Sequence, residues 1–333
     1  MNLKTLENFI SNWSVMGYQL DFEDYVKSYT KSKKINTQWD SLDSKLNGGI
    51  LPGLYCLGAI SSLGKTSFSL QLAANLAKKG YYVLYFTIEM PKYEMIARTI
   101  SQIYFENEFR VFKSQGKNAN LEIGTLEVLQ SFNKNEELFK AYCNEYFNKY
   151  QKLCFIDSSK TFDLNVNQIK KTIETFQNET GYKPIVFIDY LQILGHGEKD
   201  EKGNDKYLND KQSIDLVTKK LKQISIKFNI PIWVVSSFNR QSYKSHVSHE
   251  CFKESGVIEY TSDVLMGLQL SILDNEMPKD KDKVNIMINN AKKKYPREIT
   301  LVILKQRNGE GYIKQRFKFY PKNNFFRECA DNE

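Results

Sequence analysis

The 333-residue sequence is poor in the residues that build disulfide scaffolds and structural metal sites. It has five cysteines, an odd number, and none of them belongs to a C-x-x-C pair. His246 and His249 have no cysteine or histidine partner at metal-ligand spacing, so we interpret them as surface residues. These absences argue against a disulfide-stapled secreted domain and against a zinc site, and they favour a reducing, cytoplasmic compartment.

Long apolar runs are also absent from the sequence. No stretch approaches the roughly 20 consecutive apolar residues that a membrane-spanning helix needs. Charges interrupt the first residues, Met1–Glu7, which therefore do not resemble a signal peptide. The sequence also lacks an internal repeat with a period of about 20–50 residues, which argues against a solenoid. We expect a soluble intracellular protein with no membrane partner.

Composition and length are those of a globular protein. Apolar residues make up 41% of the chain, which is enough to bury a core in one large α/β domain or in two small ones. The 47 basic and 39 acidic residues give a net charge of +8. This moderate excess permits a polyanionic partner without requiring one.

The most informative stretch runs from Gly58 to Ser67 and reads Gly-Ala-Ile-Ser-Ser-Leu-Gly-Lys-Thr-Ser. An apolar run precedes it and a helical pattern from Phe68 to Lys79 follows, an order typical of a phosphate-binding loop. In such a loop backbone N–H groups hold phosphate oxygens, the lysine reaches the terminal phosphates and the hydroxyl holds Mg²⁺. The pattern G-x-x-x-x-G-K-[ST] departs at one position, where alanine replaces glycine. We predict that the nucleotide is bound by Ala59, Ile60, Ser61, Ser62, Leu63, Gly64, Lys65, Thr66 and Ser67.

Strand and helix patterns alternate along the rest of the chain. Near-continuous apolar runs without alternation indicate strands that are covered on both faces, as parallel sheets require. Repeated strand–helix–strand units predict an α/β fold with a doubly wound, mostly parallel sheet and helices on both faces. We expect strands near 53–57, 81–88, 153–157, 184–189, 230–236, 263–270, 299–305 and 312–320, and charged loops at 196–211 and 275–283.

Two acidic residues follow predicted strands. Ligands of open α/β sheets bind outside the carboxyl ends of the strands, so Glu89, Asp189 and the phosphate loop should face one crevice. We predict that Asp189 supports Mg²⁺ beside Thr66 and that Glu89 activates the attacking water. The alternatives are an aspartate that only caps a loop and a glutamate that only caps the following helix.

A third feature lies at the end of the strand expected near 299–305. Basic residues occur there in the segment Lys305-Gln306-Arg307-Asn308-Gly309. Lys305 and Arg307 can stabilise transition-state charge on a neighbouring subunit's nucleotide. The alternative is a hairpin turn with solvated basic residues.

Six ordered segments together resemble the C-terminal ATPase domain of DnaB-type replicative helicases, across about residues 35 to 325. They are the phosphate loop from Ala59, Ile88-Glu89-Met90, Ile188-Asp189-Tyr190-Leu191-Gln192, Ser236-Ser237-Phe238-Asn239-Arg240, residues 253–259 and residues 305–309. That family tolerates alanine at the position of Ala59. The resemblance implies a RecA-like P-loop NTPase that binds ATP and Mg²⁺ and hydrolyses ATP on single-stranded DNA as a ring, usually a hexamer. Lys305 and Arg307 would then act across the subunit interface.

The resemblance also indicates where this chain departs from the family. The family usually has glutamine at the position of Ser237, in the element that couples the γ-phosphate to DNA, so Asn239 and Gln241 are alternatives for that role. DNA contacts are expected from the channel-facing loops 196–211 and 240–249, with Lys211, Arg240 and Lys244 as candidates; such contacts would be salt-sensitive. Solvated linkers are the alternative.

Residues 1–34 are too short for the family's N-terminal collar domain. We expect a helical arm or linker there, which either docks on a neighbouring subunit or lies on its own domain, followed by the ATPase domain over 35–333. We expect a DNA helicase or translocase of DNA replication, possibly with primase or a helicase loader as partner. Two other functions stay open: a RecA-like DNA-dependent ATPase that does not unwind, and a nucleotide-binding helicase-accessory protein with little turnover.

Overall fold

A computed structural model describes residues 34–115, 125, 129–130, 135–160, 164–194, 209–252 and 256–330. From Asn36 onward the chain forms one compact unit. Apart from Lys34, the predicted arm over residues 1–34 lies outside the described residues, and so does the predicted channel loop up to residue 208.

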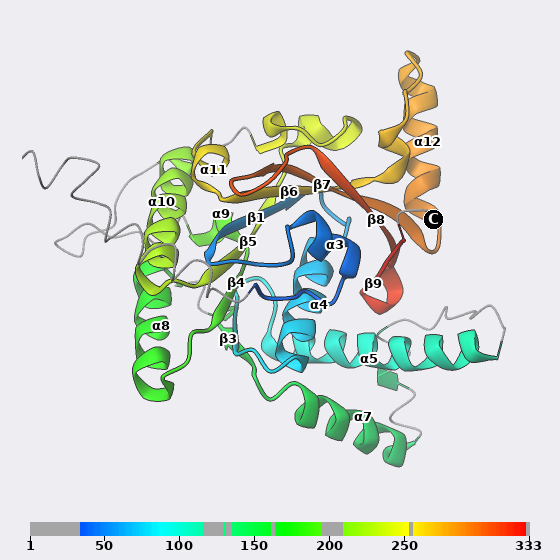
Figure 1. Cartoon of the computed structure of the whole chain (residues 1–333). Coiled ribbons are helices and arrows are strands. Elements are labelled where there is room, and N and C mark those ends of the chain that lie inside the picture. The colour runs from blue at the N-terminus through cyan, green and yellow to red at the C-terminus, as the bar shows by residue number, and fades with distance from the viewer. Residues whose placement is uncertain are drawn as a thin grey trace, which may run out of the picture. The chain divides into compact units, whose positions relative to one another are not determined.

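The unit is built on a single nine-stranded sheet with the order β3-β2-β4-β5-β1-β6-β7-β8-β9 (Figure 1). Neighbours from β3 to β6 pair in parallel, whereas β6, β7, β8 and β9 pair antiparallel. The prediction of a mostly parallel sheet is therefore confirmed. The strands are β1 (Gly53–Ala59), β2 (Val83–Thr87), β3 (Leu153–Asp157), β4 (Ile185–Asp189), β5 (Pro231–Ser237), β6 (Val264–Leu270), β7 (Arg297–Gln306), β8 (Ile313–Tyr320) and β9 (Phe325–Glu328).

Helices cover both faces of this sheet, and Figure 1 shows α8 and α10 on the side opposite α4 and α5. For this reason every residue of β1, β2, β4 and β6 is buried, which explains the continuous apolar runs. The α-helices are α3 (Asp40–Lys45), α4 (Lys65–Lys78), α5 (Lys92–Ser114), α7 (Glu136–Lys149), α8 (Val166–Thr180), α9 (Leu191–Leu194), α10 (Asp210–Phe228), α11 (Gly256–Thr261) and α12 (Lys281–Lys293).

An aromatic cluster fixes α4 against the sheet. The ring of Phe68 stacks near Trp233 of β5, with centroids 6.4 Å apart, and meets Phe317 of β8 edge-on at 5.3 Å. Buried aromatic side chains of this size dominate core energetics. The helix that begins in the phosphate loop is thus held rigidly between the parallel and antiparallel parts of the sheet.

Three sequence predictions need correction. The charged loop at 275–283 ends earlier than predicted, because α12 begins at Lys281, where Asp280 caps its first turn. The first channel loop also ends before Lys211, because Asn209 and Gln212 form a capping box that starts α10. The short edge strand β9 was not predicted.

The strand register defines two opposite edges of the sheet. At the carboxyl end of β1, Ala59 lies opposite Ser237 of β5 and Leu268 of β6. Because β7 runs antiparallel to β6, its first residues lie at that same edge, and its last residue, Gln306, lies opposite Val264 at the start of β6. We call the side of the sheet where the parallel strands end the carboxyl edge, and the side where they begin the amino edge. Both run across the strands and are distinct from the outermost strands β3 and β9.

Candidate active site

The phosphate loop occupies the carboxyl edge, between β1 and α4. Gly64 precedes the first helical residue with φ of 89°, a left-handed conformation that favours glycine. A Cβ atom there would also lie 2.8 Å from Cζ of Phe319 and 2.9 Å from Cζ of Phe326. Backbone conformation and packing therefore both require the glycine that the sequence motif places before Lys65.

Gly58, one step before the alanine that departs from the motif, is required for a different reason. A Cβ atom at Gly58 would lie 2.1 Å from Cε1 of Phe238 and 2.5 Å from the ring of Phe252. These two rings belong to the segment after β5 and pack over the end of β1. Gly58 therefore accommodates the packing of this segment, and Ala59 itself is fully buried in the sheet.

Lys65, the motif lysine, points back over its own loop. Its ammonium donates hydrogen bonds to the carbonyl oxygens of Ala59 at 3.1 Å and Ile60 at 3.3 Å. Burial lowers the pKa of Lys65, and the nearby carboxylates of Asp189 and Glu89 oppose that shift. The cation therefore lies where predicted, close to both acidic residues.

Asp189, the last residue of β4, is buried beneath the loop. Tyr85 donates its hydroxyl to Oδ2 of Asp189 at 3.2 Å. Burial raises the pKa of Asp189, and hydrogen bonds from Thr66 and Tyr85 partly offset this. Carboxylate and hydroxyl oxygens are the ligands that Mg²⁺ prefers, so the pairing of Thr66 with a buried Asp189 fits the metal that the motif implies.

A cavity of about 570 Å³ joins these residues at the carboxyl edge. Glu89 is exposed and lines it together with Lys65, Thr66, Asp189 and Ser237, so the structure brings these five predicted residues to one crevice. The same cavity is lined by two arginines that the sequence analysis missed, Arg98 of α5 and Arg297 of β7.

Ser237 and Asn239 have different surroundings. The side-chain amide of Gln192 donates to Ser236 Oγ at 2.9 Å and makes longer contacts of 3.4 Å with the backbone of Ser237. Asn239 instead caps the 3₁₀ helix η2 (Arg240–Lys244) and donates to the carbonyl of Glu250 at 3.1 Å. Asn239 thus organises the loop and does not line the cavity, whereas Gln192 links the ends of β4 and β5.

One contact joins the phosphate loop to the predicted DNA loop. The hydroxyl groups of Ser61 and Tyr243 lie 3.2 Å apart, and Tyr243 belongs to η2. Lys244 is exposed at the end of η2, and Lys211 is exposed in the first turn of α10.

Lys305 and Arg307 do not join the site of their own chain. Lys305 donates to the carbonyl oxygens of Glu259 and Tyr260, and Arg307 Nε lies 3.3 Å from Oδ1 of Asp263. All of these lie at the amino edge. The ten residues of β7 span roughly 30 Å, which is longer than any side chain.

Comparison with known proteins adds the decisive observation. The sequence profile of the family "DnaB-like helicase C terminal domain" matches residues 34–328. The chain belongs to the DnaB-like helicase C-terminal domain family.

Relatives and solved structures agree with this assignment. A probable replicative DNA helicase of Trieres chinensis is 26% identical over 83% of this chain and 53% of its own length. The replicative DNA helicase DnaB of Pasteurella multocida is 25% identical over 78% of this chain and 51% of its own length. The chain thus spans about half the length of these curated relatives.

Two solved structures share the RecA-like fold of the DnaB-like domain. A solved ATPase domain has a TM-score of 0.70 and 18% identity, covering 96% of this chain and 99% of that one. A DnaB-like replicative helicase, solved in a study of its interactions with primase, has a TM-score of 0.70 and 17% identity, covering 95% of this chain and 67% of that one.

The described residues contain no group of three or more His, Cys, Asp or Glu side chains placed to hold a metal ion. Among the same residues, no helix has the length and apolar character needed to cross a membrane.

Proposed function

We propose that this DnaB-like domain hydrolyses ATP to drive helicase or translocase movement on single-stranded DNA in replication. The supporting observation is the single cavity that joins the phosphate loop, Glu89 and Asp189 in a chain of this family. Each of these groups has a separate task in phosphoryl transfer, and positioning with electrostatic stabilisation accounts for most of such catalysis.

Lys65 and the N-terminus of α4 bind the phosphates. The helix begins directly at Lys65, so its free backbone N–H groups and its dipole favour an anion at this point. Lys65 adds a full positive charge, and exchanging its two carbonyl partners for phosphate oxygens replaces neutral acceptors with anionic ones.

Thr66 and Asp189 would hold Mg²⁺, which supplies charge neutralisation on the phosphates when bound. Tyr85 fixes Asp189 from below by a hydrogen bond. Glu89 is exposed at the cavity wall and orients the attacking water as general base.

We further propose that the protein assembles as a ring, with a hexamer as the expected form. Lys305 and Arg307 lie at the amino edge, out of reach of their own phosphate loop, so they serve the nucleotide of the next subunit. The contact between Ser61 and Tyr243 connects the nucleotide to the DNA loop in a chain whose Ser237 is shorter than the family's glutamine.

DNA contacts of Arg240, Lys244 and Lys211 belong to this proposal, as does a cytoplasmic location. One solved neighbour was studied with primase, and we propose primase or a loader as a partner of this chain on that basis.

The test is ATP hydrolysis by the purified chain with and without single-stranded DNA, followed by strand displacement on a forked duplex. We expect DNA to stimulate phosphate release and Lys65→Ala to abolish it, with an unchanged melting temperature as the control for folding. DNA-stimulated hydrolysis that survives Lys65→Ala would refute the site. Stimulated hydrolysis without strand displacement would refute the helicase function and leave the ATPase.

A further inference from the structure

Arg297 is a partly buried cation that neither the motif nor the mechanism above uses. It is the first residue of β7, and it lines the same cavity as Lys65 and Glu89. The antiparallel pairing of β6 and β7 brings this end of the strand to the carboxyl edge, where the phosphate loop lies.

The guanidinium of Arg297 joins two segments that are far apart in the sequence. Its Nη1 donates to the carbonyl oxygen of Ser62, in the middle of the phosphate loop, at 2.9 Å. Its Nε donates to the carbonyl oxygen of Lys292, in the last turn of α12, at 2.6 Å. These bonds hold the plane of the guanidinium against the loop.

Among the described residues, no carboxylate lies within ion-pair distance of the Arg297 guanidinium. The neighbouring Glu298 pairs with Lys294 instead. Burial lowers the pKa of Arg297, which means that the surroundings disfavour its positive charge. A guanidinium presents five N–H donors in a planar fork that matches phosphate oxygens. An anion bound in the cavity would supply the missing counter-charge.

We propose that Arg297 is a second phosphate-binding cation of the site, supplied in cis, which contacts the polyphosphate chain of the nucleotide while its bond to Ser62 holds the loop. This inference rests on the proposed function, because it requires that the cavity binds a nucleoside triphosphate. One subunit then places two cations at nucleotides: Arg297, at the start of β7, at its own, and Arg307, directly after β7, at that of the next subunit.

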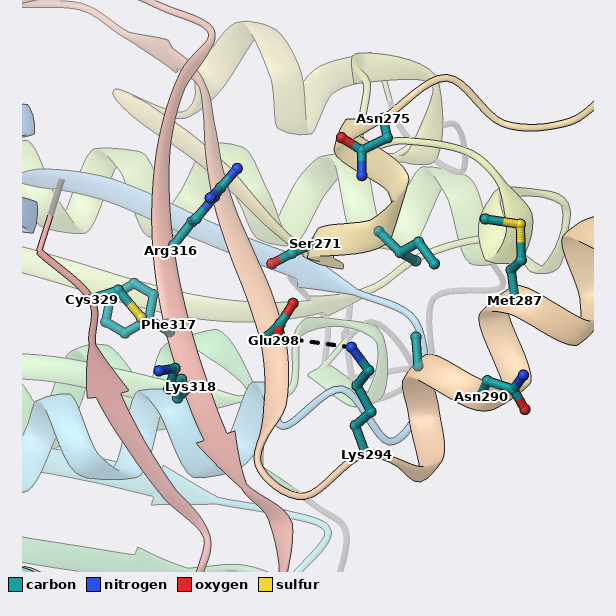
Figure 2. A pocket seen from close by; sticks show the side chains of 12 residues that line it. Ser271, Asn275, Met287, Asn290, Lys294, Glu298, Arg316, Phe317, Lys318 and Cys329 are labelled. Atoms are coloured by element: carbon teal, nitrogen blue, oxygen red, sulfur yellow. Dashed lines mark ion pairs between the residues drawn. The ribbon is translucent and has the colours of Figure 1, made fainter. Parts of the chain in front are cut away.

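Lys294, three residues before Arg297, provides a matched control. Successive strand residues point to opposite faces, and Glu298 lines a different cavity of about 590 Å³ between α12 and β8, together with Lys294, Arg316 and Lys318 (Figure 2). Glu298 and Lys294 lie 3.9 Å apart there and are both exposed. Lys294→Ala therefore removes a cation close to Arg297 in sequence but outside the phosphate site.

The first experiment measures the Kd of a non-hydrolysable ATP analogue for Arg297→Ala, Arg297→Gln, Arg297→Lys and Lys294→Ala. We expect Arg297→Ala and Arg297→Gln to weaken binding about tenfold, Arg297→Lys about threefold, and Lys294→Ala less than about twofold. Glutamine keeps one N–H donor at the position of Nε, which bonds the carbonyl oxygen of Lys292, but it carries no charge. If Arg297→Gln binds the ATP analogue as tightly as wild type, or if Arg297→Ala leaves its Kd unchanged, the charge of Arg297 does not contribute to nucleotide binding. Arg297 would then only tie α12 to the phosphate loop, and the proposal would be overturned.

The second experiment uses tripolyphosphate as a competitor, which isolates the phosphate contact from the nucleoside. We expect Arg297→Ala to weaken tripolyphosphate and the ATP analogue by the same factor. A loss confined to the ATP analogue would place Arg297 at the nucleoside and contradict the proposal.

Lys65→Ala, measured in parallel, distinguishes a failure of the proposed function from a failure of the proposed role of Arg297. If Lys65→Ala and Arg297→Ala both leave nucleotide binding intact, the proposed function fails. If only Lys65→Ala weakens binding, the proposed function stands and the role of Arg297 fails.

Discussion

Strand β7 begins at Arg297 and is followed directly by Arg307, and the surroundings of these two arginines differ sharply. Arg297 at the carboxyl edge is half-buried, bonds only carbonyl oxygens among the described residues and faces the phosphate loop. Arg307 at the amino edge has a side chain 50% exposed and pairs with Asp263. The first is built to bind within its own subunit, and the second is presented outward. In the proposed ring, residues from opposite ends of this strand would act on two different nucleotides.

Removing the outward arginine should have the largest effect. Arg307→Ala is expected to lower kcat by about a thousandfold, because an arginine that acts across an interface stabilises charge that develops in the transition state. Nucleotide affinity should change less than about twofold, in contrast to Arg297→Ala. Steady-state hydrolysis with DNA and a direct binding titration measure the two quantities. A large loss of nucleotide affinity in Arg307→Ala would contradict the claim that Arg297 and Arg307 have different roles.

Asp189→Asn tests the carboxyl edge in a second way. Hydrolysis should fall by about a hundredfold, because the neutral amide cannot neutralise the metal that Thr66 and Asp189 would hold. In the nucleotide-free protein the same change should raise stability, because burial disfavours the Asp189 carboxylate. Calorimetry without nucleotide should show a higher Tm; a lower Tm would mean that the ionised carboxylate is well compensated.

The increase in stability caused by Asp189→Asn should depend on pH. The folded protein raises the pKa of Asp189 above its ordinary value of 3.8, so it keeps a proton that the unfolded chain has lost. The contribution of Asp189 to the stability of the folded protein is therefore present at low pH. It is lost as pH rises from about 4 through the pKa that Asp189 has in the folded protein. The advantage of Asp189→Asn should grow over that range in urea titrations.

Asp263 supports the amino edge. Its carboxylate accepts hydrogen bonds from Lys222 at 2.8 and 2.6 Å and from the backbone N–H of Leu54 at 2.7 Å, in addition to its pairing with Arg307. Asp263→Ala leaves these groups without their acceptor and should destabilise the fold by about 2–3 kcal/mol. Lys222→Ala should cost less. Equal denaturation midpoints for wild type and Asp263→Ala would contradict the network.

Gly58→Ala should have the smallest effect of the series, about 1–2 kcal/mol of destabilisation. The added Cβ collides with Phe238 and Phe252, which must shift. Gly256→Ala is the matched control, because among the residues that the structure describes only Tyr260 Cε2 lies near, at 3.9 Å. The measurement is the free energy of unfolding, and equal values for the two variants would refute the packing explanation.

The sequence predicted the parallel part of the sheet well, because buried strands between helices leave continuous apolar runs. It also predicted the residues of the phosphate loop, Asp189 and Glu89, whose position follows from the rule that ligands bind at carboxyl ends. Arg297 escaped detection because its approach to Ser62 depends on the antiparallel register of β6 and β7, which no local pattern encodes.

Helix α12 was missed for a different reason. Val284, Met287, Ile288 and Ala291 have helical spacing, but they follow the charged segment 275–283, which was predicted as a loop, and of the helix residues only Ile288 is buried. Lys305 and Arg307 were predicted to act on another subunit, and their place at the amino edge supports this. That assignment stays a prediction until two chains are combined.

The most direct test mixes Lys65→Ala subunits, which lack a phosphate-binding lysine, with Arg307→Ala subunits, which lack the outward arginine. Each variant alone should be nearly inactive in DNA-stimulated ATP hydrolysis. If each site is built from two chains, mixed rings contain interfaces with an intact Lys65 and an intact Arg307, and activity should rise above the sum of the separate variants. No rise at any mixing ratio, in rings shown by light scattering to contain both variants, would contradict the account.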